Sequence, residues 1–398
     1  MHQHKQGHHN LKWHIITGVL FVLAGAGATR FLESSNLLAW PQRALLDSLP
    51  GTLTSTPATG LVIVAINDDD YAERFQRRSP LDPAGVARII GALQYFAPKT
   101  IGVDLDTSDW HPADAARVPA APARLVWARL FDADPSGPLR IATLDKVLGS
   151  DGSTVCFGLT AMQADSDLRV RQYPSQYLSE QGGETVAYPS FPLVVQRVVK
   201  DGTCPKQEKP QAEEPRTESG WNENRLLIRY RGDGHEIRRI PAGALMDTRE
   251  IAAQSPLNPA VEHMRSLLAG TIVLLGGTYK AGRDSYPTPV GMVAGVEILG
   301  QAILTAQEGP IREAGSGLIW FDIVLGLLLL LLSLHHPKLA TAVNVALLFV
   351  LIPVSGWLFR SFAFFLDTIP VQISMMVHSN FHPMLERYLE KLEERLVK

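Results

Sequence analysis

The sequence predicts an α/β domain, with a mostly parallel or mixed sheet, enclosed by hydrophobic segments at both ends of the chain. Apolar residues concentrate before Leu32 and after Gly317, which is typical of membrane-spanning segments. Between them, short apolar runs alternate with stretches whose apolar residues repeat at helical spacing, as in a layered α/β domain. In a chain of 398 residues, a net charge of −3 offers no electrostatic basis for binding nucleic acid.

The clearest strand lies within residues 271–304. Residues 271–275 form an apolar run closed by two glycines, which is typical of a strand covered on both faces. A polar loop containing Asp284 and Thr288 follows, and a helix is predicted to begin at Gly295. Because the carboxyl edge of an α/β sheet usually carries its polar chemistry, we expect functional residues in this loop.

A strand, a helix and a second strand are predicted upstream. Residues 61–66 are apolar and are followed by acidic residues. Asp82 and Pro83 open a helix, since proline suits the first helical turn. Residues 100–105 form the next strand. This βαβ unit predicts a parallel pair of strands joined by a right-handed crossover.

The remaining elements of the domain are predicted from shorter patterns. In chain order they are a helix at 123–130, a helix at 139–148, a strand at 153–160, a helix at 191–199, a strand at 225–230 and a helix at 261–268. Residues 201–220 contain many Pro, Glu and Lys residues and no apolar period. We expect them to form a mobile surface loop.

The two cysteines, Cys156 and Cys204, both lie between the hydrophobic ends. Neither has a CxxC partner or a histidine at zinc-ligand spacing, so no metal site is expected. Two alternatives remain open. In an oxidising compartment a disulfide would tie the polar loop to the strand that contains Cys156, and otherwise both residues are unpaired thiols.

Hydrophobic segments predict a multi-pass membrane protein with the lipid bilayer as a partner. The four predicted spans are residues 15–32, 317–334, 339–358 and 361–379. Four spans place residues 1–14 and 382–398 in the cytoplasm and residues 33–316 outside it. A cleavable signal peptide is the alternative for the first span, because Ala26-Gly27-Ala28 is similar to a small-residue cleavage site.

Residues 382–398 are predicted to form an amphipathic helix. Leucines spaced by four, three and four residues form one stripe, namely Leu385, Leu389, Leu392 and Leu396. Two alternatives remain open for this stripe. It docks a partner or a second copy of the chain, or it packs against its own helical bundle.

Several short motifs carry a family resemblance when they are taken in order. They are residues 61–68 (LVIVAIND), 79–82 (SPLD), 101–106 (IGVDLD), 228–232 (IRYRG), Gly276-Gly277-Thr278, Asp284, Thr288-Pro289 and Gly295-Val296-Glu297. With the hydrophobic spans, this order resembles the type-two CHASE domain, the cyclase/histidine-kinase-associated sensory extracellular domain of bacteria. Asn67 departs from the pattern, since the family usually has Asp at that position.

The resemblance implies a sensor or scaffold protein of the bacterial inner membrane. Its periplasmic domain, residues 33–316, would bind a ligand or an envelope partner, and the first hydrophobic segment would be an uncleaved anchor. The family usually attaches a kinase, cyclase or other output domain after its last span, and this sequence contains none. The resemblance therefore implies a separately encoded cytoplasmic effector, with no enzymatic activity and no cofactor in this chain.

Five polar residues in these motifs are candidates for ligand binding. They are Asp68, Asp104, Asp284, Thr288 and Glu297. Structural roles are the alternative, because strand-end carboxylates often cap turns and helix starts. Asp284 could pair with a neighbouring cation, and Glu297 suits the dipole of a helix N-terminus.

Two other functions remain as alternatives. The strand that ends in Asp104, Asp106 and Thr107 resembles the nucleophile strand of haloacid-dehalogenase-type phosphatases, in which one aspartate attacks phosphorus beside a metal ion. Those phosphatases also have, later in the chain, a strand that ends in Thr or Ser and then a Lys. This sequence has no convincing counterpart of either in that order. The other alternative is a purely structural subunit of an envelope complex.

Overall fold

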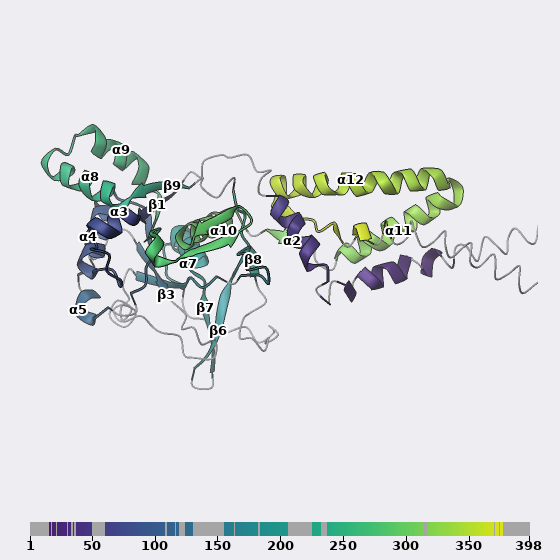
Figure 1. Cartoon of the computed structure of the whole chain (residues 1–398), viewed down its shortest axis with the longest axis horizontal. Coiled ribbons are helices and arrows are strands. Elements are labelled where there is room, and N and C mark those ends of the chain that lie inside the picture. The colour runs from purple at the N-terminus through teal and green to yellow at the C-terminus, as the bar shows by residue number, and fades with distance from the viewer. Residues whose placement is uncertain are drawn as a thin grey trace, which may run out of the picture. The chain divides into compact units, whose positions relative to one another are not determined.

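A computed structural model describes residues 16–49, 60–129, 155–205, 225–231, 237–309 and 311–376, with short gaps inside several of these ranges. The chain separates into two compact units (Figure 1). We call residues Leu53–Pro310 the α/β unit. Residues Met1–Thr52 together with Ile311–Lys398 form the helical unit.

The α/β unit is built on a six-stranded sheet in which every pair of neighbours is parallel. Its strands are β1 (Leu61–Ile66), β2 (Thr100–Asp104), β3 (Arg124–Arg129), β4 (Val155–Leu159), β9 (Arg238–Pro241) and β10 (Ile272–Gly277). They lie in the order β4-β3-β2-β10-β1-β9. The predicted α/β class with a mostly parallel sheet is therefore confirmed.

Strand β10 takes the central place in this sheet. It pairs with β1 on one side, where Leu61 is opposite Ile272, and with β2 on the other, where Thr100 is opposite Ile272. The predicted direct pairing of β1 with β2 is thus wrong, although the two strands are parallel. The apolar side chains of β10 are buried on both faces, and a central position is the one that covers both faces of a strand.

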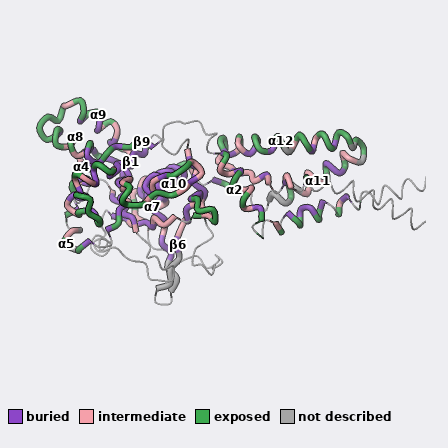
Figure 2. The backbone as a smooth tube through the Cα atoms, in the orientation of Figure 1, coloured by how far each residue is buried: buried purple, intermediate pink, exposed green. Residues whose placement is uncertain are grey.

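Helices cover the two faces of the sheet (Figure 1). One face packs against α4 (Pro83–Tyr95), α8 (Ala242–Gln254) and α9 (Pro259–Leu268). The other packs against α7 (Phe191–Asp201) and α10 (Gly295–Glu308). Figure 2 shows α10 as largely buried, in agreement with the burial of most of its residues. A helix with so little exposed surface is held in place from several sides.

Smaller elements complete the α/β unit. They are α3 (Asp68–Glu73), α5 (Pro112–Ala115), β5 (Gln172–Pro174), β6 (Gln176–Gln181), β7 (Glu184–Pro189), β8 (Arg225–Leu227), η2 (Lys280–Gly282), β11 (Ser285–Thr288) and β12 (Gly291–Ala294). The pairs β5–β8, β6–β7 and β11–β12 are antiparallel and lie outside the main sheet.

Local sequence signals explain several of these boundaries. The side chain of Asp82 accepts a hydrogen bond of 3.0 Å from the backbone N–H of Gly85, and Pro83 occupies the first helical turn of α4. This combination satisfies one of the free amides of the helix start and fixes its direction. The predictions of β1, of the start of α4 and of α7 and α10 are confirmed.

Three local predictions differ from the structure, wholly or in part. Residues 123–130 were expected to be helical, and they contain strand β3, whose Val126 and Trp127 suit a strand buried on both faces. The strand predicted at 225–230 is shorter and pairs with β5 rather than with the main sheet. The polar loop after β10 contains the β11–β12 hairpin. The helix predicted at 139–148 and residues 206–220 of the polar insert lie outside the described residues.

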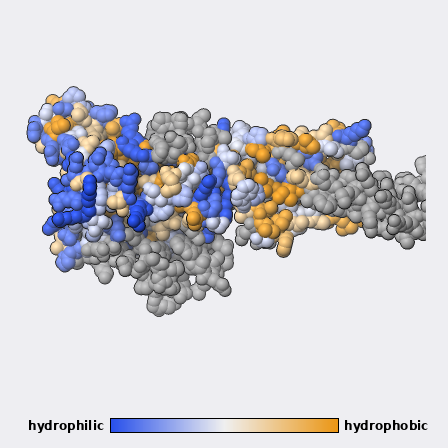
Figure 3. Space-filling view, in the orientation of Figure 1, coloured by the Kyte–Doolittle hydropathy of each residue, from blue (hydrophilic) through white to orange (hydrophobic). Residues whose placement is uncertain are grey.

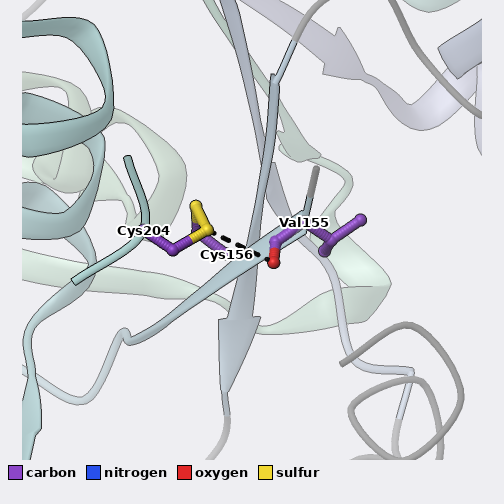
Figure 4. Close-up of a disulfide and its surroundings, with 3 residues drawn as sticks. All are labelled: Val155, Cys156 and Cys204. Carbon is purple, nitrogen blue, oxygen red and sulfur yellow. Dashed lines mark hydrogen bonds between the residues drawn. A yellow bond between two sulfur atoms is a disulfide. The ribbon is translucent and has the colours of Figure 1, made fainter. Parts of the chain in front are cut away.

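Cys156 and Cys204 form a disulfide, with 5.2 Å between their Cα atoms. Figure 4 shows this disulfide, and it also shows the carbonyl oxygen of Val155, which lies 3.5 Å from Cys204 Sγ. Cys156 belongs to the edge strand β4, and Cys204 follows the left-handed Gly202 that ends α7. The disulfide therefore ties the carboxyl end of α7 to the edge of the sheet.

The helical unit contains α2 (Ala39–Ser48), α11 (Gly317–His335), α12 (Pro337–Phe362) and the short strands β13 (Arg312–Glu313) and β14 (Phe364–Phe365). Among its described residues, only Lys338–Phe362 is helical, apolar and long enough to cross a membrane by length and composition. Gly18–Thr29 and Ile323–Ser333 are shorter apolar helices. The predicted span at 339–358 lies within α12, which is longer and continues to Phe362.

Close packing joins the helices of this unit. A Cβ added to Gly18 would lie 2.3 Å from Leu330 Cδ1, and a Cβ added to Gly326 would lie 2.8 Å from Val22 Cγ1. The N-terminal apolar helix and α11 are therefore antiparallel, with each glycine receiving a larger side chain from the other helix. Such small-residue contacts let helix backbones approach closely in membranes.

Candidate functional site at the carboxyl edge of the sheet

The chain leaves neighbouring strands of the sheet toward opposite faces. After β10 it continues to α10, which packs on the face that contains Leu274. After β2, Leu105 and Trp110 pack on the opposite face, and after β1 the chain enters α4 on that same opposite face. The carboxyl ends of β2 and β10 are therefore a topological switch point, the usual place for ligands in open α/β sheets.

Two carboxylates lie at this switch point. Asp104 is the last residue of β2 and Asp284 precedes β11, and both are half-buried. Burial, and secondarily the charge of Asp284, raises the pKa of Asp104 to about 8. Burial also raises the pKa of Asp284, although a hydrogen bond from Tyr286 acts in the opposite direction. A buried carboxyl beside a second carboxyl resists ionisation, so Asp104 is largely protonated near neutral pH.

The start of α10 lies directly against Asp284. The backbone N–H of Gly295 donates a 3.0 Å hydrogen bond to the carbonyl oxygen of Asp284. A Cβ added to Gly295 would lie 2.4 Å from Asp284 Oδ2, so only glycine leaves room for the carboxylate here. The N-cap residue, Ala294, provides no side-chain cap. The positive end of the α10 dipole thus lies beside a negative side chain.

Two tyrosines, Tyr279 and Tyr286, lie within electrostatic reach of the carboxylate pair, and a third, Tyr71, packs on one of them. Tyr279 stacks on Tyr71, with 4.2 Å between ring centroids and 7° between planes. Burial raises the pKa of Tyr279, and the neighbouring Tyr71 and then the negative charges of Asp284 and Asp106 raise it further. Burial and Asp284 also raise the pKa of Tyr286 to about 12. Both phenols therefore remain hydrogen-bond donors over the physiological pH range.

The other predicted ligand residues have structural partners. Asp68 Oδ1 accepts a 2.8 Å hydrogen bond from the backbone N–H of Lys280, which fixes the start of η2. Thr288 is buried, and its hydroxyl donates to the carbonyl oxygen of Gly291 within the hairpin turn. These two side chains hold the loop around the carboxylate pair in shape.

Glu297 is the fifth predicted residue, and it lies in the first turn of α10. Its side chain is 4% exposed, and its Oε1 atom lies 2.8 Å from Nε of Arg239 on strand β9. The ion pair ties α10 to the edge strand on the side away from β2. The structure therefore brings together Asp104 and Asp284 and places Asp68, Thr288 and Glu297 in supporting contacts.

This arrangement is poorly suited to the phosphatase alternative. A nucleophilic aspartate must be ionised, whereas the raised pKa of Asp104 keeps that carboxyl protonated near neutral pH. Asp106 is exposed. Within the described ranges, no group of three or more His, Cys, Asp or Glu side chains could hold a metal ion.

The sequence motifs did not single out the tyrosines. Tyr286 is two residues from Asp284, which is the spacing of side chains on the same side of a strand, but Pro287 and Pro289 made that segment read as a loop. Tyr279 follows the Gly-Gly-Thr motif. Its stacking on Tyr71 depends on the pairing of β10 with β1, which no local pattern reveals.

Comparison with known protein families gives one result. The family model of the CHASE2 domain matches residues 16–335, which is most of the chain. Comparisons with curated proteins and with solved structures find no match. CHASE2 domains are extracellular sensory domains of membrane proteins rather than catalytic domains. On the strength of this match, the protein belongs to the CHASE2 domain family.

Proposed function

We propose that the α/β unit senses a small extracytoplasmic ligand at the switch point and that the helical unit carries the resulting signal across the inner membrane. The observation that carries this proposal is the half-buried pair of Asp104, at the end of β2, and Asp284, in the loop after the neighbouring strand β10. The membership in a family of sensory extracellular domains supports the same role.

The chemistry of the pair indicates the class of ligand. The charge that acts on Asp104 is the negative charge of Asp284, and burial is the main cause of the raised pKa of both carboxyls. Tyr279 and Tyr286 add hydroxyl groups and aromatic rings. A ligand with an ammonium or guanidinium group would neutralise the carboxylates and contact the rings through cation–π attraction.

Several observations support a multi-pass arrangement of the helical unit. Lys338–Phe362 is long enough to span a membrane. The chain then returns along α12, because Ser355 Oγ donates to the carbonyl oxygen of Leu366 and Asn344 Nδ2 donates to that of Met375. The disulfide suits an oxidising compartment such as the periplasm. We therefore retain four spans, with residues 33–316 outside the cytoplasm.

The output of the sensor is proposed to be a separate cytoplasmic effector or envelope protein. The candidate docking residues, Leu385, Leu389, Leu392 and Leu396, lie outside the described residues. A ligand can shift a signalling equilibrium only if it binds two conformations with different affinity. The first residue of α10, Gly295, is hydrogen-bonded to Asp284, and α10 precedes α11 in the chain. A change at the switch point therefore has a short covalent route to the helical unit.

The experiment that tests this function is a thermal-shift measurement on the purified full-length protein. The probes are small ammonium and guanidinium compounds, with matched carboxylate compounds as negative controls. We expect a cationic probe to raise the unfolding temperature of the wild-type protein and to lose this effect with Asp284→Asn. Glu262→Gln is the matched control, since Glu262 is 68% exposed and contacts only a neighbouring surface arginine.

The outcomes of this test are distinct. A shift that persists unchanged in Asp284→Asn would place the ligand elsewhere. No shift with any cationic probe in the wild-type protein, together with stable complexes with envelope proteins, would favour the structural-subunit function. A shift with carboxylate probes would contradict the proposed charge of the ligand.

A further inference from the structure

The contacts within the helical unit bring several chain segments to one end of it. The backbone N–H of Arg312 donates a 2.8 Å hydrogen bond to the carbonyl oxygen of Ala363, so the segment before α11 lies beside the end of α12. The side chain of Gln42 on α2 donates to the carboxylate of Asp367. We call this the β13–β14 end.

Tryptophans gather at this end. Among the described residues of the helical unit, the tryptophans are Trp40, Trp320 and Trp357, with 77%, 71% and 58% of their surface exposed. Trp40 lies on α2, Trp320 in the first turns of α11 and Trp357 in the last turns of α12. Three different helices therefore expose an indole ring close to the same end of the bundle.

The rest of the exposed surface changes in character along the helices. The middle parts of α11 and α12 expose aliphatic and phenyl side chains, such as Leu328, Val345 and Phe349. Figure 3 shows hydrophobic side chains over this unit. At the opposite end, the turn between the two helices exposes His335 and Lys338. An apolar middle with indoles at one end and cationic groups at the other is the pattern of membrane-spanning helices.

Helix α2 presents two different sides. Leu38, Leu45 and Leu49 are buried, and a Cβ on Gly356 of α12 would lie 3.8 Å from Leu49 Cδ2, so this side packs on the bundle. The other side exposes Trp40. A short helix that continues from an apolar segment and exposes an indole suits the layer of lipid headgroups, where the apolar ring is buried and its N–H finds a polar partner.

We propose that Trp40, Trp320 and Trp357 form a belt at the level of the lipid headgroups, on the side of the membrane where the chain leaves and re-enters the helical unit, and that α2 lies in this interfacial layer. The partner of this surface is lipid, because the exposed indoles are continuous with the apolar exposed faces of α11 and α12. Both chain connections to the α/β unit, after Leu49 and before Ile311, leave from these segments.

The test measures the depth of spin labels in the bilayer. Single cysteines replace Trp40, Trp320 and Trp357, with Phe349→Cys as the reference for the bilayer centre. Leu257→Cys, at a residue of the α/β unit that is 94% exposed, is the reference for water. The native cysteines are bonded to each other and remain unlabelled under non-reducing conditions. The full-length protein is reconstituted in vesicles of phosphatidylcholine and phosphatidylglycerol.

We expect the three tryptophan positions to share one depth, between the two references, as measured by the relative accessibility to oxygen and to a water-soluble nickel complex. Ala44→Cys, at an exposed position of α2, repeats the measurement where the loss of an indole cannot disturb packing. The proposal would be overturned if the labels at residues 40 and 44 were as accessible to the nickel complex as the label at residue 257. A Phe349→Cys label in water would instead contradict membrane spanning itself.

Discussion

Replacing Asp104 with asparagine should remove a specific part of the pH dependence of stability. The pKa of Asp104 is raised from 3.8 to about 8 in the folded protein. Between these values the folded state holds a proton that the unfolded state has released, so the free energy of unfolding falls as pH rises through this window. The ceiling for one group is about 1.4 kcal/mol per pH unit.

The magnitude follows from this slope. From pH 5 to pH 7 the wild-type protein should lose up to about 2.7 kcal/mol through Asp104, and less if solvent screens the half-buried carboxyl. Asp104→Asn keeps a neutral side chain of the same shape and should lose none of this amount. Asp284→Asn should reduce the slope only in part, because burial is the larger cause of the shift and the charge of Asp284 the smaller.

The assay is chemical unfolding of the purified full-length protein at several pH values, followed by tryptophan fluorescence. Trp127 is a suitable reporter, since it is fully buried on β3 next to β2 and its Nε1–H donates to Thr107 Oγ1 at 3.1 Å. Glu262→Gln provides the control for loss of an exposed carboxylate. If wild-type protein and Asp104→Asn lose stability equally between pH 5 and 7, the reasoning about this proton is refuted.

Three further predictions concern other parts of the molecule. Replacing Cys156 and Cys204 with serine should lower the free energy of unfolding by about 2–4 kcal/mol, because the disulfide closes a loop with a sequence separation of 48 residues; chemical unfolding measures this, and an unchanged midpoint would contradict it. Gly326→Leu should disrupt the contact with Val22 and lower the thermal stability of the detergent-solubilised protein, whereas the same substitution at an exposed position of α11 should not. Replacing Leu389 and Leu392 with aspartate should abolish co-purification of a partner or a second copy without reducing membrane insertion, and retention of the same complexes would show that this stripe is not a docking site.

Local patterns in the sequence correctly predicted those helices and strands that are marked by a few consecutive residues. Asp82 followed by Pro83 marks the start of α4, and the apolar run of residues 61–66 corresponds to β1. Strand β3 was misread as a helix, because a short apolar run such as residues 124–129 has no periodicity that distinguishes the two. The β11–β12 hairpin was read as a loop because Pro287 cannot donate to a strand ladder.

The candidate site was predicted only as a set of residues near one edge. Asp104 was placed at the end of a predicted strand and Asp284 in the loop after another. Their coupling depends on β10 lying beside β2, and this pairing joins segments far apart in the chain. The same pairing pattern brings Tyr279 against Tyr71. Asp68 and Glu297 carry the same functional groups, and the structure shows that they are held by Lys280 and Arg239.

The central position of β10 has a consequence for the biosynthesis of the protein. Strands β1 and β2 are made early and flank a gap that only residues 272–277 fill. Until that segment has left the ribosome and crossed the membrane, each of the two strands has an unpaired edge, which invites wrong pairing with other chains. The sheet and its switch point are thus completed at the same moment, just before the segment that forms α11 is made. An exported fragment that ends before Thr271 should therefore be a substrate for extracytoplasmic proteases rather than a partly folded domain.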